Sequence, residues 1–221
     1  MTNMNNKETS TIMKLAETAI LAALCYVSFT FLQIKIPVPG GDATSLHIGN
    51  AFCVLAALLL GGVYGGMAGA VGMTIADLMD PVYITGAPKT FVLKLCIGLI
   101  TGLVAHKVAK INESTDKSYV FKWSLIASVA GLAFNVVADP VVGFFYKQYV
   151  LGQPQEMAAV LAKLSAVTTF VNAVVSVILV VFIYNALRPA LIKMNLIQIH
   201  PVQKDKTVSA EIGRASCRER V

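Results

Sequence analysis

Residues 165–188 read SAVTTFVNAVVSVILVVFIYNALR, with no charged side chain before Arg188. A helix of about 20 apolar residues is long enough to cross the hydrocarbon core of a bilayer. This stretch therefore predicts a transmembrane helix. Five further apolar runs precede it in the chain, at about 15–34, 46–61, 63–80, 90–109 and 120–147.

The composition of the whole chain agrees with this prediction. Of 221 residues, 56% are hydrophobic and 14% are charged, whereas an average soluble domain has about 25% charged residues. We predict an all-α integral membrane protein with six transmembrane helices in one bundle. The second and third runs are short and share an uncharged, glycine-rich link at 61–66, so a single bent or re-entrant segment is the alternative there.

The expected organisation has four parts. A cytoplasmic segment at 1–14 precedes the membrane domain at 15–195, and a cytoplasmic tail follows at 196–210. The last stretch, 211–221, reads EIGRASCRERV. The reverse complement of a common sequencing adapter encodes this peptide in one frame, so we expect it to be an artefact. The first apolar run lacks a small-residue cleavage site, which argues against a cleavable signal.

The distribution of Lys and Arg predicts the orientation, because cytoplasmic loops are enriched in both. With the expected artefact at 211–221 and its three Arg set aside, ten of these residues fall on the side of the two termini and five on the opposite side in a six-span arrangement. We therefore expect both termini in the cytoplasm, and a location in the bacterial plasma membrane. The formal net charge is +6, and +5 without residues 211–221. This positive charge reflects topology and anionic lipid, and it does not indicate nucleic acid.

Polar side chains gather in the predicted outer halves of five spans, while the inner halves read as nearly pure aliphatic residues and glycine. Intramembrane polar groups are costly, so this asymmetry predicts a pocket open to the outside. A structural role in bonding helices together is the alternative for each side chain, and Asp77, Asp80 and Lys94 could form a charge-compensated cluster. The expected substrate-binding residues are His47, Asn50, Asp77, Asp80, Tyr83, Lys94, Asn135, Asp139 and Asn172.

Two loops are expected beside this pocket. Residues 33–42 combine prolines with glycines, as expected for an extended, flexible lid. Residues 81–88 present Tyr83, which we expect to cover a ligand ring, together with Phe31.

Small residues mark two helix surfaces. The glycines between 62 and 72 are expected to pack against other helices of the bundle. Ala19 and Ala23 lie one helical turn apart in the first span, where internal packing and contact with a partner protein are both open.

The sequence offers little reactive chemistry. It contains no G-x-x-x-x-G-K-[ST] nucleotide-binding motif, so any energy must come from a partner. Cys25, Cys53 and Cys96 are isolated in apolar runs and are expected to be small buried hydrophobes. The paired aspartates match neither a phosphatidyltransferase nor an intramembrane aspartyl protease. We therefore expect no catalytic residue, no metal and no cofactor.

Four segments together resemble the substrate-binding S components of energy-coupling factor (ECF) vitamin transporters. They are His47-Ile48-Gly49-Asn50-Ala51, the run at 57–65, Asp77-Leu78 and the run APKTFVLK at 87–94. The likeness covers about residues 12–195 and is strongest to the branch of proposed hydroxymethylpyrimidine and pyridoxine carriers. It implies a six-helix fold, an outward pocket, a lid-like first loop and a vitamin-sized ligand. It also implies docking through Ala19 and Ala23 to a transmembrane scaffold protein with two ATPase subunits.

The predicted function is high-affinity capture of a small vitamin or vitamin precursor, of the pyridoxine or hydroxymethylpyrimidine type, for import driven by the partner ATPases. The alternatives are an S component for another vitamin, such as pantothenate or riboflavin, and an unrelated membrane channel or enzyme subunit.

Overall fold

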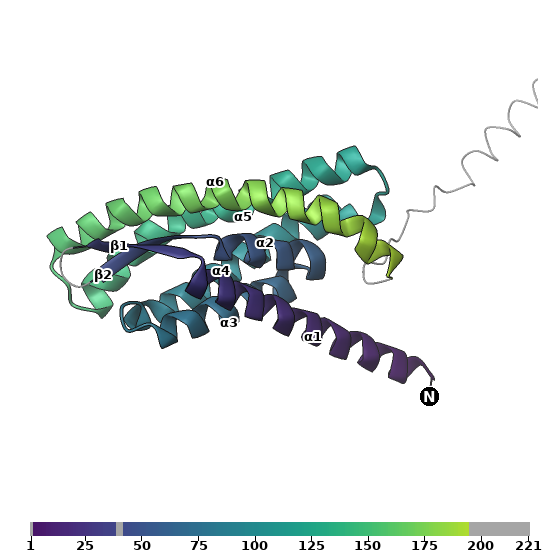
Figure 1. Cartoon of the computed structure of the whole chain (residues 1–221), viewed down its shortest axis with the longest axis horizontal. Helices are drawn as coiled ribbons and strands as arrows, with labels where there is room; N and C mark the ends of the chain where they lie inside the picture. Colours follow the sequence, from purple (N-terminus) through teal and green to yellow (C-terminus); the bar gives the residue numbers. More distant parts are fainter. Residues whose placement is uncertain (1, 39–41, 195–221) are drawn as a thin grey trace, which may run out of the picture.

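The computed structural model describes residues 2–38 and 42–194. The described chain forms one β-hairpin and a bundle of six α-helices (Figure 1). The predicted tail at 196–210 and the predicted artefact at 211–221 lie outside the described residues. In chain order the elements are α1 (Thr2–Phe31), β1 (Gln33–Val38), β2 (Asp42–His47), α2 (Gly49–Leu60), α3 (Gly62–Met79), α4 (Ala87–Gly102), α5 (Lys117–Phe145) and α6 (Gln155–Lys193).

Four segments of the described chain are long and apolar enough to span a membrane. They are Thr11–Phe31, Ile84–Val108, Lys117–Val150 and Gln155–Lys193. The short helix α2 has 12 residues and rises about 18 Å, which is less than the thickness of a bilayer core. The six helices and the multi-pass character are therefore confirmed, whereas the count of six spans stays a prediction.

The segment predicted as an extended, flexible lid contains two paired antiparallel strands, β1 and β2, on either side of residues 39–41, which lie outside the described residues. Strand β1 pairs with β2 from Gln33↔His47 to Val38↔Asp42. Ile34, Ile36 and Val38 alternate along β1, and such β-branched residues favour a strand. The predicted second span, 46–61, is thus wrong at its start, because His47 ends β2 rather than beginning a helix.

Glycines allow three helices of the bundle to pack at backbone distance. Gly61, at φ 89°, joins α2 directly to α3, and a Cβ atom on Gly65 would lie 2.2 Å from the Cα atom of Ala57. Likewise, a Cβ atom on Gly98 of α4 would lie 2.2 Å from the Cα atom of Gly66. The glycines of α3 therefore serve internal packing, as predicted. Helices α2 and α3 are joined directly at Gly61, and both descriptions of this stretch, as two spans and as one bent or re-entrant segment, stay predictions.

The bundle has two distinct ends (Figure 1). The hairpin and the beginning of α6 lie at one end, which we call the hairpin end. The beginning of α1 and the end of α6 lie at the other, which we call the terminal end. The two described ends of the chain therefore share one side of the molecule, as the even number of predicted crossings requires.

The half of the bundle toward the terminal end is more polar than the sequence suggested. Thr101, Ser124, Ser128 and Tyr184 are all buried there. The Ser128 hydroxyl donates to the backbone oxygen of Ser124 at 2.6 Å, a bond within one helix that hides the hydroxyl from its apolar neighbours. The expectation of nearly pure aliphatic inner halves is therefore wrong.

Candidate substrate pocket

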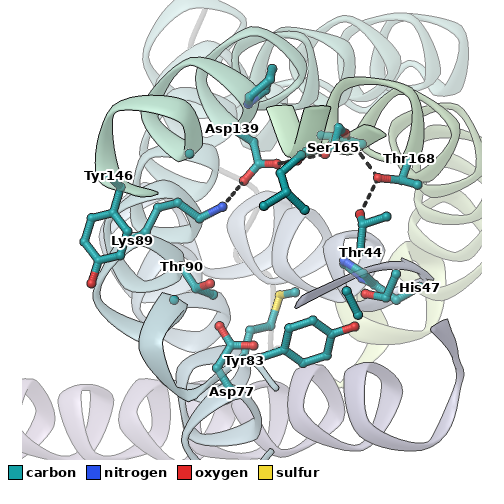
Figure 2. Close-up of a pocket in the computed structure, with 18 of the residues that line it drawn as sticks. Thr44, His47, Asp77, Tyr83, Lys89, Thr90, Asp139, Tyr146, Ser165 and Thr168 are labelled. Carbon is teal, nitrogen blue, oxygen red and sulfur yellow. Dashed lines mark hydrogen bonds and ion pairs between the residues drawn. The ribbon is translucent and has the colours of Figure 1, made fainter. Parts of the chain in front are cut away.

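A pocket opens at the hairpin end, enclosed by β2 and by parts of all six helices (Figure 2). The first turns of α2, α4 and α6 reach it, as do the last turns of α1, α3 and α5. The side chains that surround it point toward a shared central space in Figure 2. Residues far apart in the sequence are therefore brought together at one end of the bundle.

Eight of the nine predicted binding residues line this pocket. Asp80 is the exception, because its carboxylate forms an ion pair with Lys35 and accepts a hydrogen bond from the backbone N–H of Val82 at 3.1 Å. Phe31 is 71% exposed, and Phe29, one face of the helix away, lines the pocket instead. The eight residues are His47, Asn50, Asp77, Tyr83, Lys94, Asn135, Asp139 and Asn172.

Asp139 of α5 is the centre of a charged network on one wall (Figure 2). Lys89 of α4 donates to its Oδ1 atom at 2.9 Å, and Thr169 of α6 donates to its Oδ2 atom at 3.1 Å. Ser165 also donates to Oδ2. Because both oxygens of the carboxylate are engaged by the protein, Asp139 fixes Lys89 and α6 in place around the pocket.

Lys94 and Asn50 form a second polar pair deeper in the bundle. The Lys94 ammonium donates to Asn50 Oδ1 at 2.9 Å, and the two residues are 7% and 1% exposed. An ammonium has three protons to donate, so this bond leaves donors for a ligand. Asp77, which is 3% exposed, lies across the space beside Thr90 (Figure 2).

Asn172 of α6 holds the hairpin against the pocket. Its Oδ1 atom accepts from the backbone N–H of His47 at 3.0 Å, and its Nδ2 atom donates to the backbone oxygen of Ser45 at 2.9 Å. A hydroxyl pair, Thr44 and Thr168, joins the same two elements at 2.7 Å. Asn172 therefore acts on the position of β2 as well as on the pocket wall.

Asn135 Oδ1 and His47 Nδ1 are buried in the pocket and have no hydrogen-bond partner among the described residues. Burial lowers the pKa of His47 to about 3, with Lys94 contributing, so the imidazole is neutral at physiological pH. The ring packs edge-on against Phe29, with centroids 4.7 Å apart. A buried polar group without a partner is costly, and a ligand in the pocket would supply one.

Lys35 and Asp80 fasten the hairpin from outside the pocket. The Lys35 ammonium also lies 5.5 Å from the centroid of the Tyr83 ring. Partial burial works to raise the pKa of Asp80, but the hydrogen bonds from Lys35 and from the Val82 N–H hold it below its ordinary value. Asp80 is therefore a contact of the hairpin, and its predicted role in substrate binding does not fit its position.

Several residues of the pocket were absent from the predicted set. Lys89, Thr168 and Thr169 contribute polar groups, and Phe29 and Tyr146 contribute aromatic rings. Ser165, Thr168, Thr169 and Asn172 follow helical spacing along one face of α6, which is a signal that the sequence contained. Nothing in the sequence indicated that Phe29 and not Phe31 would face inward.

The two alanines predicted to meet a partner lie on the outside of the bundle. Ala19 and Ala23 are exposed, whereas Ala22 faces the interior, where a Cβ atom on Gly72 would lie 2.2 Å from its backbone oxygen. Internal packing therefore does not account for these two side chains, and docking to a partner stays a prediction.

These features define a multi-pass membrane protein with a polar ligand pocket at one end of a helical bundle. A family model described as "ECF-type riboflavin transporter, S component" matches residues 9–189. The chain belongs to this family of ECF transporter S components, which are vitamin-binding transport proteins and not enzymes. The family model names riboflavin, one of the alternative substrates, and does not name pyridoxine or hydroxymethylpyrimidine.

A curated protein of Pyrococcus woesei, described as an "uncharacterized protein in gap 3'region", is 36% identical over 76 residues. That alignment covers 34% of this chain and 49% of the relative, so the chain spans about half the length of the curated relative it matches. No solved structure matches the chain significantly.

Proposed function

We propose that this chain captures riboflavin in the pocket at the hairpin end and delivers it to an ECF module for import. The main support for this proposal is that paired ionic groups, unpartnered polar atoms and aromatic rings converge in one pocket. The chain that forms this pocket matches the riboflavin-type family model. Riboflavin is uncharged, with a flat ring system, an amide-like edge and a chain of hydroxyls.

The charges of the pocket support an uncharged ligand. Lys89 is paired with Asp139 at 2.9 Å, and the buried Lys94 and Asp77 are one cation and one anion. A ligand with a full charge would leave one of these groups without compensation in a dry site, which is costly. Hydroxyls and ring nitrogens can instead bond to all of them.

The aromatic residues support a ligand with a flat ring. Phe29 and Tyr83 lie 5.9 Å apart between ring centroids, at the side of the pocket formed by α1 and the link between α3 and α4. Aromatic side chains favour offset or edge contacts with other rings. Asn135 Oδ1, which has no partner in the described protein, would accept from a donor on the ring edge.

Pyridoxine or hydroxymethylpyrimidine is the second candidate, favoured by the motifs at 47–51 and 87–94. Both compounds are single rings with hydroxymethyl groups, and both would use the same lysines and carboxylates. They differ from riboflavin in size and in lacking the long hydroxyl chain, so direct competition separates the two proposals.

The test is a fluorescence titration of riboflavin with the purified full-length chain in detergent, because flavin fluorescence changes when the ring is buried. We expect saturable binding that Lys94→Met weakens by on the order of a hundredfold and that Lys163→Met, at an exposed position of α6 outside the pocket, leaves unchanged. Displacement of a bound vitamin by pyridoxine but not by riboflavin would favour the second candidate. Absence of binding by either class would contradict both.

We further propose that transport requires a scaffold protein and two ATPase subunits, bound through the face of α1 that carries Ala19 and Ala23. Their exposure and small size support this docking site, since small residues let a partner helix approach closely. Both termini are then cytoplasmic and the hairpin end faces outward.

A further inference from the structure

A second hollow lies at the terminal end, between the first turn of α5 and the last turns of α6. It is separate from the vitamin pocket and shares no lining residue with it. Lys117 and Ser118 enter it from α5, and Asn185 and Arg188 enter it from α6. Thr115 lines it as well, so its chemistry is set by two cations and three neutral polar groups.

The electrostatics of this hollow favour an anion. Lys117 and Arg188 line it, and no acidic side chain of the described residues does. Asp116, the acidic group next along the chain, is occupied as the N-cap of α5, where it accepts from the Ser118 N–H at 3.0 Å. The N-terminal end of α5 and the C-terminal end of α6 both border the hollow, and their helix dipoles are of opposite sign, so the preference for an anion comes from the two cationic side chains.

Arg188 is preorganised for this role. It is 6% exposed, and its Nη2 atom donates to the backbone oxygens of Ile111 at 2.7 Å and Ser114 at 3.1 Å. Its buried Nε atom makes no hydrogen bond by geometry within the described part of the chain, and the buried hydroxyl of Tyr184, one turn earlier on α6, interacts with the guanidinium. The loop before α5 and Tyr184 thus hold the guanidinium in place.

The remaining lining is apolar and continues onto the outside of the bundle. Val120, Phe121 and Ile192 line the hollow together with Pro189. Phe121 is 51% exposed, so its ring extends the apolar surface toward the lipid. A soluble anion would leave this surface unused, whereas an acyl chain would cover it.

We propose that this hollow binds an anionic phospholipid, with the headgroup phosphate at Lys117, Ser118 and Arg188 and an acyl chain along Phe121 and Ile192. Basic pockets between transmembrane helices on the cytoplasmic side are the kind of site in which acidic lipid headgroups bind. The site is independent of the vitamin and of the proposed substrate class. It fastens the loop at 109–116 and the ends of α5 and α6 to the membrane surface.

Native mass spectrometry of the full-length chain with equal amounts of phosphatidylglycerol and phosphatidylcholine tests this proposal. We expect phosphatidylglycerol to be retained preferentially, and Lys117→Gln to lower its retention by about fivefold, the effect of one basic residue at a membrane surface. Lys122→Gln is the matched control, because Lys122 is exposed on the same helix and does not line the hollow. Lys117 is exposed, so the variant should fold and keep its vitamin affinity.

Two outcomes would overturn the proposal. Equal loss of phosphatidylglycerol in both lysine variants would show a diffuse surface charge rather than a site. Displacement of the lipid by millimolar inorganic phosphate, with the same dependence on Lys117, would identify a free anion as the ligand. Phe121→Ser separates the sources further, because it should weaken the lipid and leave phosphate unaffected.

Discussion

Polar side chains at the two ends of the bundle differ in how many of them bond within their own helix. At the terminal end, Ser128 and Asn185 donate to backbone oxygens of their own helices at 2.6 and 2.7 Å, and Arg188 reaches across to the loop before α5. At the hairpin end, Lys89 and Asn172 reach across to other elements, and Asn135 keeps an unpartnered oxygen. Polarity alone therefore does not identify a site. Polar groups that converge from several elements on a shared space do.

The largest effect is expected from the outer face of α1. Ala19→Leu with Ala23→Leu adds bulk where both residues are exposed, so a partner helix can no longer approach. We expect vitamin uptake by cells that express the whole transporter to be lost, while the isolated chain binds its ligand with unchanged affinity. Ala22→Leu is an instructive contrast, because Ala22 packs on Gly72 and the change should destabilise the fold.

Normal uptake by the double alanine variant would show that the docking face lies on another helix. Loss of ligand binding by the isolated variant would instead show that α1 and the pocket are coupled.

The comparison of the two ends is tested most directly by Lys94→Met against Ser128→Ala. Lys94→Met removes a buried donor of the pocket and leaves Asn50 unpaired, and losing a charged partner costs about 2–3 kcal/mol, or on the order of a hundredfold in affinity. Ser128→Ala should leave affinity unchanged, because its hydroxyl serves its own helix. Isothermal titration with purified variants measures both. Equal losses would remove the distinction between the ends.

Much of the pocket was predictable from the sequence, because the cost of an intramembrane polar group is a local property. Asp77, Lys94 and Asp139 each interrupt an apolar run, and all three line the pocket. Asp80 does not line the pocket. It lies one helical turn after Asp77, beyond the end of α3, and pairs with Lys35 outside the pocket. Helix periodicity places a side chain on a face but does not give its depth.

The hairpin was not predictable in the same way. Its strands are stabilised by pairing with each other from Gln33↔His47 to Val38↔Asp42 and by contacts with α6, such as Thr44 to Thr168. The contact of Thr44 with Thr168 joins residues separated by 124 positions, and no local pattern contains it. Pro39, Gly40 and Gly41, which are part of the predicted lid at 33–42, lie outside the described residues.

Asn172→Ala tests whether the hairpin is part of the binding site. The change removes both bonds that hold β2, one to the His47 N–H and one from Nδ2 to the Ser45 oxygen. We expect ligand affinity to fall about tenfold, within the 1–3 kcal/mol cost of unsatisfied buried groups, through faster dissociation. Stopped-flow displacement measures this rate. A variant that melts early but dissociates its ligand at the normal rate would show a purely structural role.

The smallest effect is expected from Lys35→Ala, which removes the ion pair with Asp80. The side chain of Lys35 is 43% exposed, and exposed ion pairs contribute about 0–1 kcal/mol, so affinity should fall by no more than about fivefold.

The pKa of Asp80 is held below its ordinary value. The stabilisation is therefore fully present above the pKa of an unfolded aspartate, about 3.9, and it is lost as the pH falls through the lower pKa of the folded protein. Added salt screens an exposed ion pair. Wild-type affinity should therefore decline with added salt at neutral pH, while the affinity of Lys35→Ala should not depend on salt. A salt dependence that persists unchanged in Lys35→Ala would assign the effect to other charges, and the hairpin would then be held by Asn172 and Thr44 alone.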